Sequence, residues 1–324
     1  MPAPLFSDYL VERRLLRRKL SFWRVAAFGV AIIGVLAAGL RLFGTDQTSS
    51  FTPHIAKLSI SGLITGSSQT LKTIQDIEES QAAAVLISIN SPGGTTSGSE
   101  RLFDAIRRLS AKKPTVAVVG DLAASGGYVA ALGADQIVAQ GNSLVGSIGV
   151  LFQFPNFTKL LDTVGVNVET VKSSPLKASP NGFEPTTPEA RAALASLVED
   201  SYAWFKTLVK ERRAMTDQQL AAVVDGRVFT GRQGVDLHLV DRLGGEREAI
   251  AWLEQEKSVK KGLPVRDWKP KGAWSGLGIL GFSAHVADTL GFGGLSRTLA
   301  HGAELAQVRM LDGLVSIWQI ESTN

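Results

Sequence analysis

The sequence predicts an α/β fold with one transmembrane helix at its N-terminal end. Its 324 residues, of which 44% are hydrophobic and 20% charged, are sufficient for a sizeable core. After residue 53, buried strands and amphipathic helices alternate along the chain, which indicates βαβ units with right-handed crossovers. The chain contains no cysteine, so disulfide bonds and thiolate chemistry are excluded.

The predicted transmembrane anchor covers residues 22–43. Its uncharged part, residues 25–40, would rise only about 24 Å as a helix, so the apolar residues on either side must complete the span. One basic residue, Arg41, closely follows the uncharged part. The basic residues that precede the uncharged part are Arg13, Arg14, Arg17, Arg18, Lys19 and Arg24. By the positive-inside rule we expect a cytoplasmic basic tail at residues 1–21 and an extracytoplasmic location for residues 44–324.

Two other interpretations of this region are weaker. A cleavable signal peptide would need an unusually long charged region, and residues 37–39 (Ala-Ala-Gly) make a poor cleavage site. A nucleic-acid-binding patch would explain the basic cluster but not the uncharged run that follows it. We therefore expect an uncleaved anchor in contact with a lipid bilayer, in a chain that does not bind nucleic acid.

The first half of the predicted core contains three strands and two helices. Strand signals are alternating apolar and polar residues or continuous β-branched runs, and they fall at 54–60, 83–90 and 115–120. Apolar positions spaced three and four apart predict helices at 68–79 and 97–111. The sequence Ser-Pro-Gly-Gly at 91–94 is expected to end the second strand, and Pro114 the second helix. A polar linker at 44–52 precedes these elements.

The second half of the predicted core continues the alternation of helices and strands. A turn of small residues opens a helix at 123–133, and short strands are expected at 136–139 and 167–171. Further helices are predicted at 156–164, 188–213, 216–224 and 246–256. The Gly-rich residues 225–245 are expected to form structural turns. These elements define a domain at 53–262 and a C-terminal extension at 263–324 whose role the sequence does not indicate.

Several classes of enzyme are excluded by the motifs that are missing. The chain contains no His-Glu-x-x-His zinc motif, no Walker phosphate loop and no G-x-S-x-G turn, and its four histidines are scattered. Gly276, Gly278 and Gly281 match G-x-G-x-x-G, but no β-branched strand precedes them, so a dinucleotide site is not expected. We therefore predict neither a metal ion nor a cofactor.

Two Gly-rich turns are the candidates for chemistry, because each directly follows a buried strand. In the first, residues 91–94, glycines allow backbone N–H groups to point at a ligand oxygen, although an ordinary strand-to-helix turn explains it equally well. In the second, Ala123-Ala124-Ser125-Gly126-Gly127, a hydroxyl is placed where a helix begins. Ser125 is then either a nucleophile or simply the N-cap of that helix.

Taken together, these segments resemble the signal peptide peptidase A family, serine peptidases with a Ser-Lys dyad on a Clp-protease/crotonase-like fold. The resemblance covers about residues 54–250 and includes GNSLVGSIGV at 141–150, KSSPLKASP at 172–180 and the Gly-rich residues 225–245. The single catalytic copy and short anchor are similar to the short form of the family.

The resemblance implies a role for five residues. Ser125 matches the nucleophile, Lys177 the general base, and Ser147 a serine that hydrogen-bonds the lysine amine; the N–H groups of Gly94 and Gly126 match the oxyanion hole. Lys172 lies nearby, but the family pattern places the catalytic lysine several residues after the Lys-Ser pair, which selects Lys177. The residues around Lys177 depart from the family pattern, in which Gly often precedes the lysine and Asp follows it.

The implied function is hydrolysis of cleaved signal peptides and other membrane-associated peptides, in the 53–262 peptidase domain, on the periplasmic side of a bacterial inner membrane. The resemblance also implies a homo-oligomer, such as an octamer in which neighbouring subunits share an active site. Two alternatives are a crotonase-type acyl-CoA enzyme and a non-catalytic membrane scaffold. Neither needs Ser125 or Lys177, so labelling of Ser125 by a serine-reactive probe distinguishes them from a peptidase.

Overall fold

A computed structural model of the chain describes residues 23–24, 26–30, 52–270 and 315–317. The chain divides into two units, residues 1–52 and 53–324. In the first unit, residues 23–24 and 26–30 are helical. Most of the predicted anchor and nearly all of the linker lie outside the described residues. Within the part of the chain that is described, no helix combines the length and the apolar character needed to cross a bilayer.

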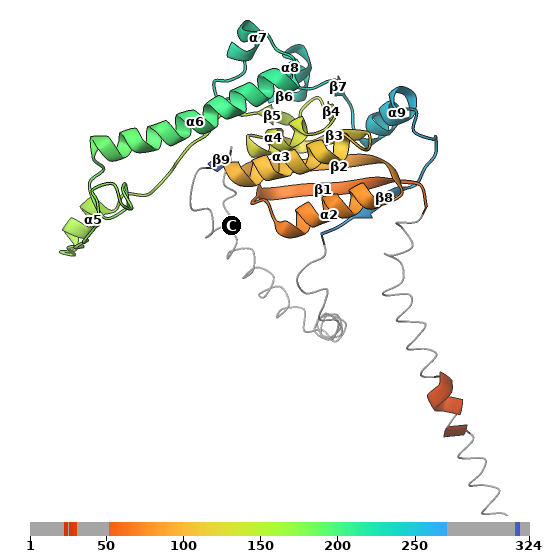
Figure 1. The fold of residues 1–324 in the computed structure, drawn as a ribbon, viewed down its shortest axis with the longest axis horizontal. Coiled ribbons are helices and arrows are strands. Elements are labelled where there is room, and N and C mark those ends of the chain that lie inside the picture. The colour runs from red at the N-terminus through yellow and green to blue at the C-terminus, as the bar shows by residue number, and fades with distance from the viewer. Residues whose placement is uncertain (1–22, 25, 31–51, 271–314, 318–324) are drawn as a thin grey trace, which may run out of the picture. The chain divides into compact units, whose positions relative to one another are not determined.

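The second unit confirms the predicted α/β class, because it is built on one mixed sheet (Figure 1). The main path of this sheet runs in the order β6-β5-β3-β2-β1-β8. Its strands are β1 (His54–Ile64), β2 (Ala82–Thr95), β3 (Thr115–Ala124), β4 (Gln136–Ala139), β5 (Leu144–Gly146), β6 (Val228–Thr230), β7 (Arg242–Leu243), β8 (Val265–Trp268) and β9 (Val315–Ile317). The pairs β1–β2, β2–β3 and β3–β5 are parallel, whereas β5–β6 and β2–β9 are antiparallel.

Helices cover both faces of this sheet. The helices are α2 (Ser68–Glu79), α3 (Thr96–Ser110), α4 (Gly126–Leu132), α5 (Thr158–Thr163), α6 (Pro188–Arg212), α7 (Asp217–Ala221), α8 (Gly231–Asp236) and α9 (Glu246–Glu256). Alternate residues of β2 face opposite sides: Ile87 and Ile89 join the core shared with α2, α3 and α4, while Leu86 packs with Trp252 of α9. Because strand side chains alternate between faces, one apolar run serves both cores.

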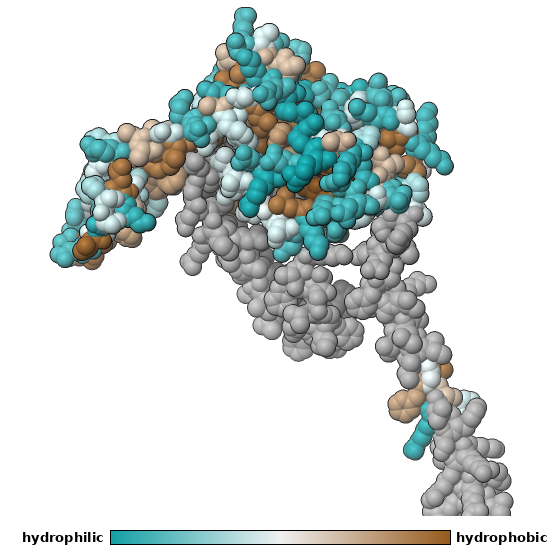
Figure 2. All heavy atoms as spheres, in the orientation of Figure 1, coloured by the Kyte–Doolittle hydropathy of each residue, from teal (hydrophilic) through white to brown (hydrophobic). Residues whose placement is uncertain are grey.

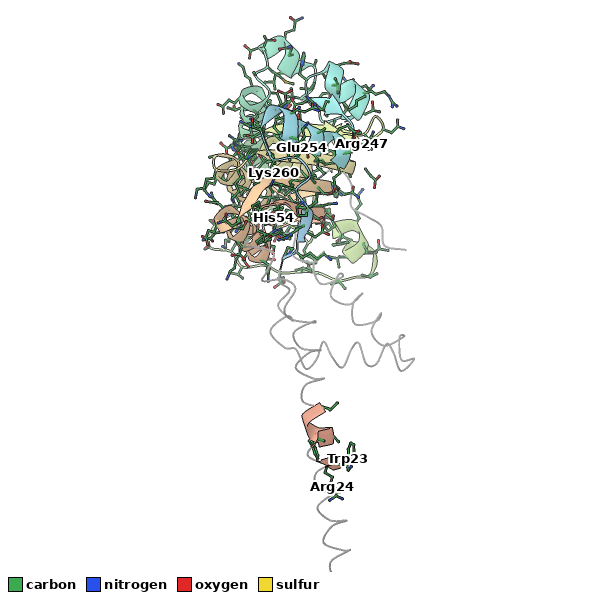
Figure 3. The ribbon with its side chains drawn as sticks, turned by 90° about the vertical axis from the view of Figure 1, so that its right-hand side faces the viewer. Trp23, Arg24, His54, Arg247, Glu254 and Lys260 are labelled. Atoms are coloured by element: carbon green, nitrogen blue, oxygen red, sulfur yellow. The ribbon has the colours of Figure 1, made fainter. Side chains whose placement is uncertain are left out.

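Three expectations about the elements need correction. The turn at 91–94 does not end the second strand, because β2 continues to Thr95 while pairing with β1 on one edge. Residues 167–171 are not a strand: they are exposed and pair with no strand in the described part of the chain. In the predicted C-terminal extension, β8 joins the sheet beside β1. There Trp268 donates a 3.1 Å hydrogen bond from Nε1 to Nε2 of His54, the buried residue at the start of β1 labelled in Figure 3.

An arm, defined as residues 150–197, extends from the sheet and carries α5 and the first turns of α6 (Figure 1). The end of α6 packs on the core through the buried residues Phe205, Leu208 and Val209. The arm itself leaves large apolar side chains exposed, as the brown surface near α5 shows in Figure 2. These residues are Leu151, Phe157, Leu160, Val164, Val166, Val168, Val171, Leu176, Phe183 and Leu197.

Candidate active site

The structure brings the two Gly-rich segments together, the first as the last part of β2 and the second at the turn that follows β3. Ser91 on β2 pairs with Ala123 on β3, one strand apart in the parallel sheet. β3 then ends at Ala124, and α4 begins at Gly126. A carboxyl-terminal edge of parallel strands is where open α/β sheets bind ligands. The nucleophile and oxyanion-hole candidates therefore share one edge of the sheet.

Ser125 occupies the sharp turn between β3 and α4 in a strained backbone conformation. Its φ of 54° and ψ of −118° are rare for a residue with a Cβ atom. Two backbone hydrogen bonds hold it there: its N–H donates to the carbonyl of Gly146 at 2.8 Å, and its carbonyl accepts from Val129 N–H at 3.0 Å. Its side chain makes no capping bond. The N-cap interpretation therefore does not explain this serine, whereas a strained strand-to-helix turn is a known device for presenting a nucleophile.

Glycines allow the two turns to approach closely. A Cβ atom on Gly94 would lie 1.9 Å from the carbonyl oxygen of Ile64, so no other residue fits beside β1. A Cβ atom on Gly127 would lie 2.6 Å from the carbonyl oxygen of Ser91. α4 therefore rests directly on the backbone of β2, and this contact brings Gly126 close to the end of β2 that contains Gly94.

Ser147 lies next to the nucleophile candidate, while its contact with the lysine amine stays a prediction. It follows β5, whose Gly146 pairs with Ala124 of β3. Ser147 also has a left-handed backbone, with φ of 51°, and is 7% exposed. Ser125 Oγ lies 3.4 Å from the carbonyl oxygen of Gly149, a long hydrogen bond in the same turn. The segment 146–149 thus forms one wall of the site.

Lys177 lies elsewhere, in the segment between α5 and α6. This exposed segment lies at the far end of α6 from α4 (Figure 1). The C-terminal end of α6 contacts the core, because Arg212 donates to carbonyl oxygens at the end of α4. A helix of 25 residues rises about 37 Å, so the N-terminal end of α6 is remote from that contact. One copy of the chain therefore does not bring Lys177 to Ser125.

The structure distinguishes Lys172 from Lys177, the two lysines considered as the general base. Lys172 Nζ forms an ion pair with Glu184 Oε2 at 2.5 Å. Lys177 has no ion pair with any residue in the described part of the chain, and its backbone N–H donates to Ser174 O at 3.1 Å. A base must offer a free electron pair, so the lysine already bound to a carboxylate is the poorer candidate.

The antiparallel strand β9 lies beside the oxyanion-hole candidate. β3 leaves β2 after the pairing of Ala123 with Ser91, and β9 pairs with the next residues of β2. In this ladder, Gly94 is opposite residue 316 and Thr95 opposite residue 315. Sequence analysis missed β9, because its three residues give no periodic signal. The edge of β2 beside Ser125 therefore binds an extended chain segment.

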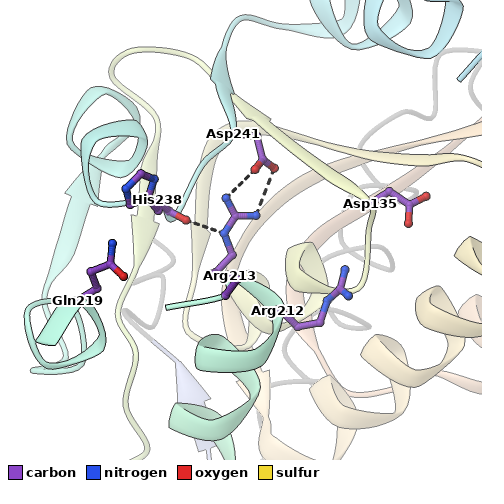
Figure 4. Close-up of a pocket in the computed structure, with 7 residues that line it drawn as sticks. Asp135, Arg212, Arg213, Gln219, His238 and Asp241 are labelled. Carbon is purple, nitrogen blue, oxygen red and sulfur yellow. Dashed lines mark hydrogen bonds and ion pairs between the residues drawn. The ribbon is translucent and has the colours of Figure 1, made fainter. Parts of the chain in front are cut away.

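A pocket of about 500 Å³ lies at the other end of α4. Figure 4 shows that Arg213 reaches both Asp241, at 2.7 Å, and the carbonyl of His238, at 2.6 Å. Arg212 donates to the carbonyl oxygens of Leu132 and Ala134 at 2.8 and 2.9 Å. Its arginines thus already have partners within the fold. We interpret these arginines as structural residues that hold the end of α4 in place, and we do not interpret the pocket as a ligand site.

Comparison with known proteins identifies the family. The sequence profile named Peptidase family S49 matches residues 107–260. A putative protease of Synechocystis is 36% identical over 206 residues, which cover 63% of this chain and 74% of that protein. The chain belongs to peptidase family S49. It is a serine peptidase, and Ser125 and its turn lie within the matched residues.

Other relatives of the S49 chain are longer. The chloroplastic serine protease SPPA of Arabidopsis thaliana is 32% identical over 62% of this chain but only 30% of its own length. Protease 4 of Haemophilus influenzae is 30% identical over 59% of this chain and 31% of its own length. Among solved structures, a ClpP1 mutant from Listeria monocytogenes covers 60% of the chain and 94% of its own, with 15% identity and a TM-score of 0.41.

Proposed function

We propose that this S49 peptidase hydrolyses peptide bonds through an acyl-enzyme on Ser125, with Lys177 of a neighbouring copy as general base. The observation that carries the proposal is the strained, 1% exposed Ser125 at a strand-to-helix turn, whose helix packs on Ser91 of β2. Ser147 shares the positive φ and the burial, but only Ser125 stands at a junction between a buried strand and a buried helix in the described chain. We further propose that the α/β core is of the Clp-protease/crotonase type.

The chemistry follows from what each group can do. A neutral Lys177 amine takes the proton of the Ser125 hydroxyl as its oxygen bonds to the scissile carbonyl carbon. The N–H groups of Gly94 and Gly126 stabilise the resulting oxyanion, each contributing about 3 kcal/mol by comparison with measured oxyanion holes. The protonated amine then gives its proton to the leaving nitrogen as the peptide bond breaks. Water, activated by the same amine, releases the acyl group.

The substrate is expected to bind as an extended strand. β9 supports this, because residues 315–317 pair antiparallel with Gly93–Thr95 next to the proposed oxyanion hole. Main-chain hydrogen bonds to a strand edge bind peptides largely without regard to their side chains. A substrate that uses this edge must displace β9, and the burial of Ser125 also requires that its surroundings open.

A homo-oligomer explains both the position of Lys177 and the surface of the arm. Ten large apolar side chains of the arm are exposed in a single copy, and a second copy could bury them. We propose that the arm packs against a second copy of the chain and there delivers Lys177 to that copy's Ser125. An octamer with shared sites, as the sequence resemblance implies, would have this property.

Location and substrate class are also proposals. The uncharged run at 25–40, with its preceding basic cluster, supports an anchor at 22–43 in a bacterial inner membrane and a periplasmic peptidase domain. A relative from Enterococcus faecium, 31% identical over 230 residues, is named a putative signal peptide peptidase SppA. We propose that this chain likewise hydrolyses signal peptide remnants and other membrane-associated peptides.

Mixing two inactive variants tests the shared site. Ser125→Ala lacks the nucleophile and Lys177→Ala lacks the base, so each should be inactive alone. Co-assembled chains should recover activity, because some sites then combine Lys177 of one variant with Ser125 of the other. Lys159→Ala, which changes another exposed lysine of the arm, is the matched control and should remain active. Absence of activity in co-assembled chains at every ratio would exclude sharing, and hydrolysis by Ser125→Ala would exclude the nucleophile.

A further inference from the structure

The segment that carries Lys177 has almost no apolar core of its own. Residues 173–178 are all exposed, and they form turns instead of a helix or strand. Ala178, directly after Lys177, has a left-handed backbone with φ of 54°. A loop of this kind is usually mobile unless polar contacts fix it. The conformation of the Lys177 loop, residues 172–184, must therefore depend on its hydrogen bonds and ion pairs.

One ion pair closes the base of this loop. Lys172 Nζ and Glu184 Oε2 lie 2.5 Å apart, and the two side chains are 14% and 29% exposed. Both side chains are therefore less exposed than residues 173–178 around Lys177. The pKa of Glu184 is lowered chiefly by its hydrogen bond with Lys172, and also by Asn181 and Thr170. Several donors therefore converge on one carboxylate, which remains ionised at neutral pH.

A short chain of hydrogen bonds connects this pair with the residue after Lys177. Asn181, which also lowers the pKa of Glu184, donates from Nδ2 to the carbonyl oxygen of Ala178 at 3.1 Å. The Asn181 Oδ1 atom accepts the N–H of Phe183 at 2.9 Å. The carboxylate of Glu184 thus acts on the backbone beside Lys177 through one intervening side chain.

We propose that Lys172 and Glu184 are positioning residues that hold the Lys177 loop in the conformation that delivers the general base. This proposal rests on the proposed function of Lys177. A lysine that enters a neighbouring subunit's site must be presented at the correct height and angle, because a misplacement of about 1 Å can lower a rate by roughly 100-fold. The pair is partly exposed, so its contribution to folding is modest and its loss should affect catalysis more than stability.

The test measures kcat and KM for a fluorogenic peptide in Glu184→Gln, Lys172→Gln and the charge-exchanged Lys172→Glu/Glu184→Lys chain. We expect each single variant to lower kcat about tenfold with KM within twofold, since the peptide-binding edge of β2 is unchanged. The exchanged chain restores an ion pair and should recover most of the lost kcat. Lys210 and Asp217 form an ion pair of the same 2.5 Å length outside the arm, so Asp217→Asn is the matched control and should keep wild-type kcat.

The outcomes separate this proposal from the one on which it rests. A Glu184→Gln chain with wild-type kcat would overturn the positioning role while leaving Lys177 as base, provided that Lys177→Ala is inactive. An active Lys177→Ala chain would overturn both. If the single variants lose kcat only because they no longer assemble, size-exclusion chromatography will show smaller particles, and the pair is then an assembly contact. Loss of kcat in intact oligomers with no recovery in the exchanged chain also counts against an ion-pair role.

Discussion

Replacing Gly127 by alanine should separate the two halves of the proposed active site. Gly127 lies on α4, two residues after Ser125, where the helix rests on the carbonyl oxygen of Ser91. An added Cβ atom would lie 2.6 Å from that oxygen, whereas ordinary contact begins at 3.4 Å. Gly127→Ala therefore has to move α4 and β2 apart by about 0.8 Å.

This movement changes the distance between the two proposed oxyanion-hole donors, because Gly126 belongs to α4 and Gly94 to β2. A misplacement of about 1 Å lowers a rate by roughly 100-fold, so we expect kcat to fall by about 10- to 100-fold. Overpacking a core typically costs about 1–3 kcal/mol. For a domain of this size, each kcal/mol lowers Tm by roughly 2–4 °C.

The assay combines peptide hydrolysis with a thermal melt of the full chain. Gly120→Ala is the matched control, because a Cβ atom there would lie 3.5 Å from its nearest neighbour, the carbonyl oxygen of Ile89. That variant should keep kcat within twofold, and its Tm should not fall. The reasoning is refuted if Gly127→Ala turns over substrate at the wild-type rate, or if Gly120→Ala loses as much activity.

Three further outcomes are expected. Tyr128→Phe removes a buried 2.8 Å hydrogen bond to the carbonyl of Leu239, so the free energy of unfolding should fall by about 1–3 kcal/mol in a denaturant titration. Val315→Pro combined with Ser316→Pro removes two N–H groups from β9 and weakens its pairing with β2, so the KM for peptides should fall. An unchanged KM would show that β9 does not compete with substrate. The N–H of Gly245 chiefly lowers the pKa of Glu248, from 4.5 to about 2. The ionised Glu248 carboxylate stabilises the fold above pH 4.5, and this stabilisation is lost as the pH falls through 2. The Tm difference between wild type and Glu248→Gln should therefore vanish near pH 2.

The sequence predicted those elements whose signal is local. The helices at 68–79 and 246–256 and the strand at 136–139 were predicted with the observed bounds. The strand expected at 167–171 is absent, because alternation shows only that a segment could pair and does not provide a partner strand. The strand end expected at 91–94 is absent because neighbouring strands on both sides pair with Gly93 and Gly94 and keep them in β2. β8 was missed because its four residues acquire their structure from β1.

For the site, the sequence predicted which turns matter but not how they meet. Small residues at 123–127 indicated a hydroxyl placed where a helix begins, and the structure shows what that helix packs on, the backbone of β2. The left-handed backbone of Ser125 could not be predicted, because glycine is the residue that usually adopts it. The distance of Lys177 from Ser125 follows from the projection of α6, a property of packing that no motif records. Glu184 was missed entirely, since a lone glutamate in a polar loop carries no signal.

At Ser125 the Cβ atom lowers the stability of the fold, but it also carries the hydroxyl that the proposed reaction needs. A residue with a Cβ atom at φ of 54° and ψ of −118° is about 1–2 kcal/mol less stable there than glycine. Ser125→Gly should therefore give a chain that melts at a higher temperature and hydrolyses nothing, whereas Ser125→Ala keeps the strain and loses only the hydroxyl. The side chain at this position therefore lowers the stability of the fold, and its benefit lies in what its hydroxyl can do to another molecule.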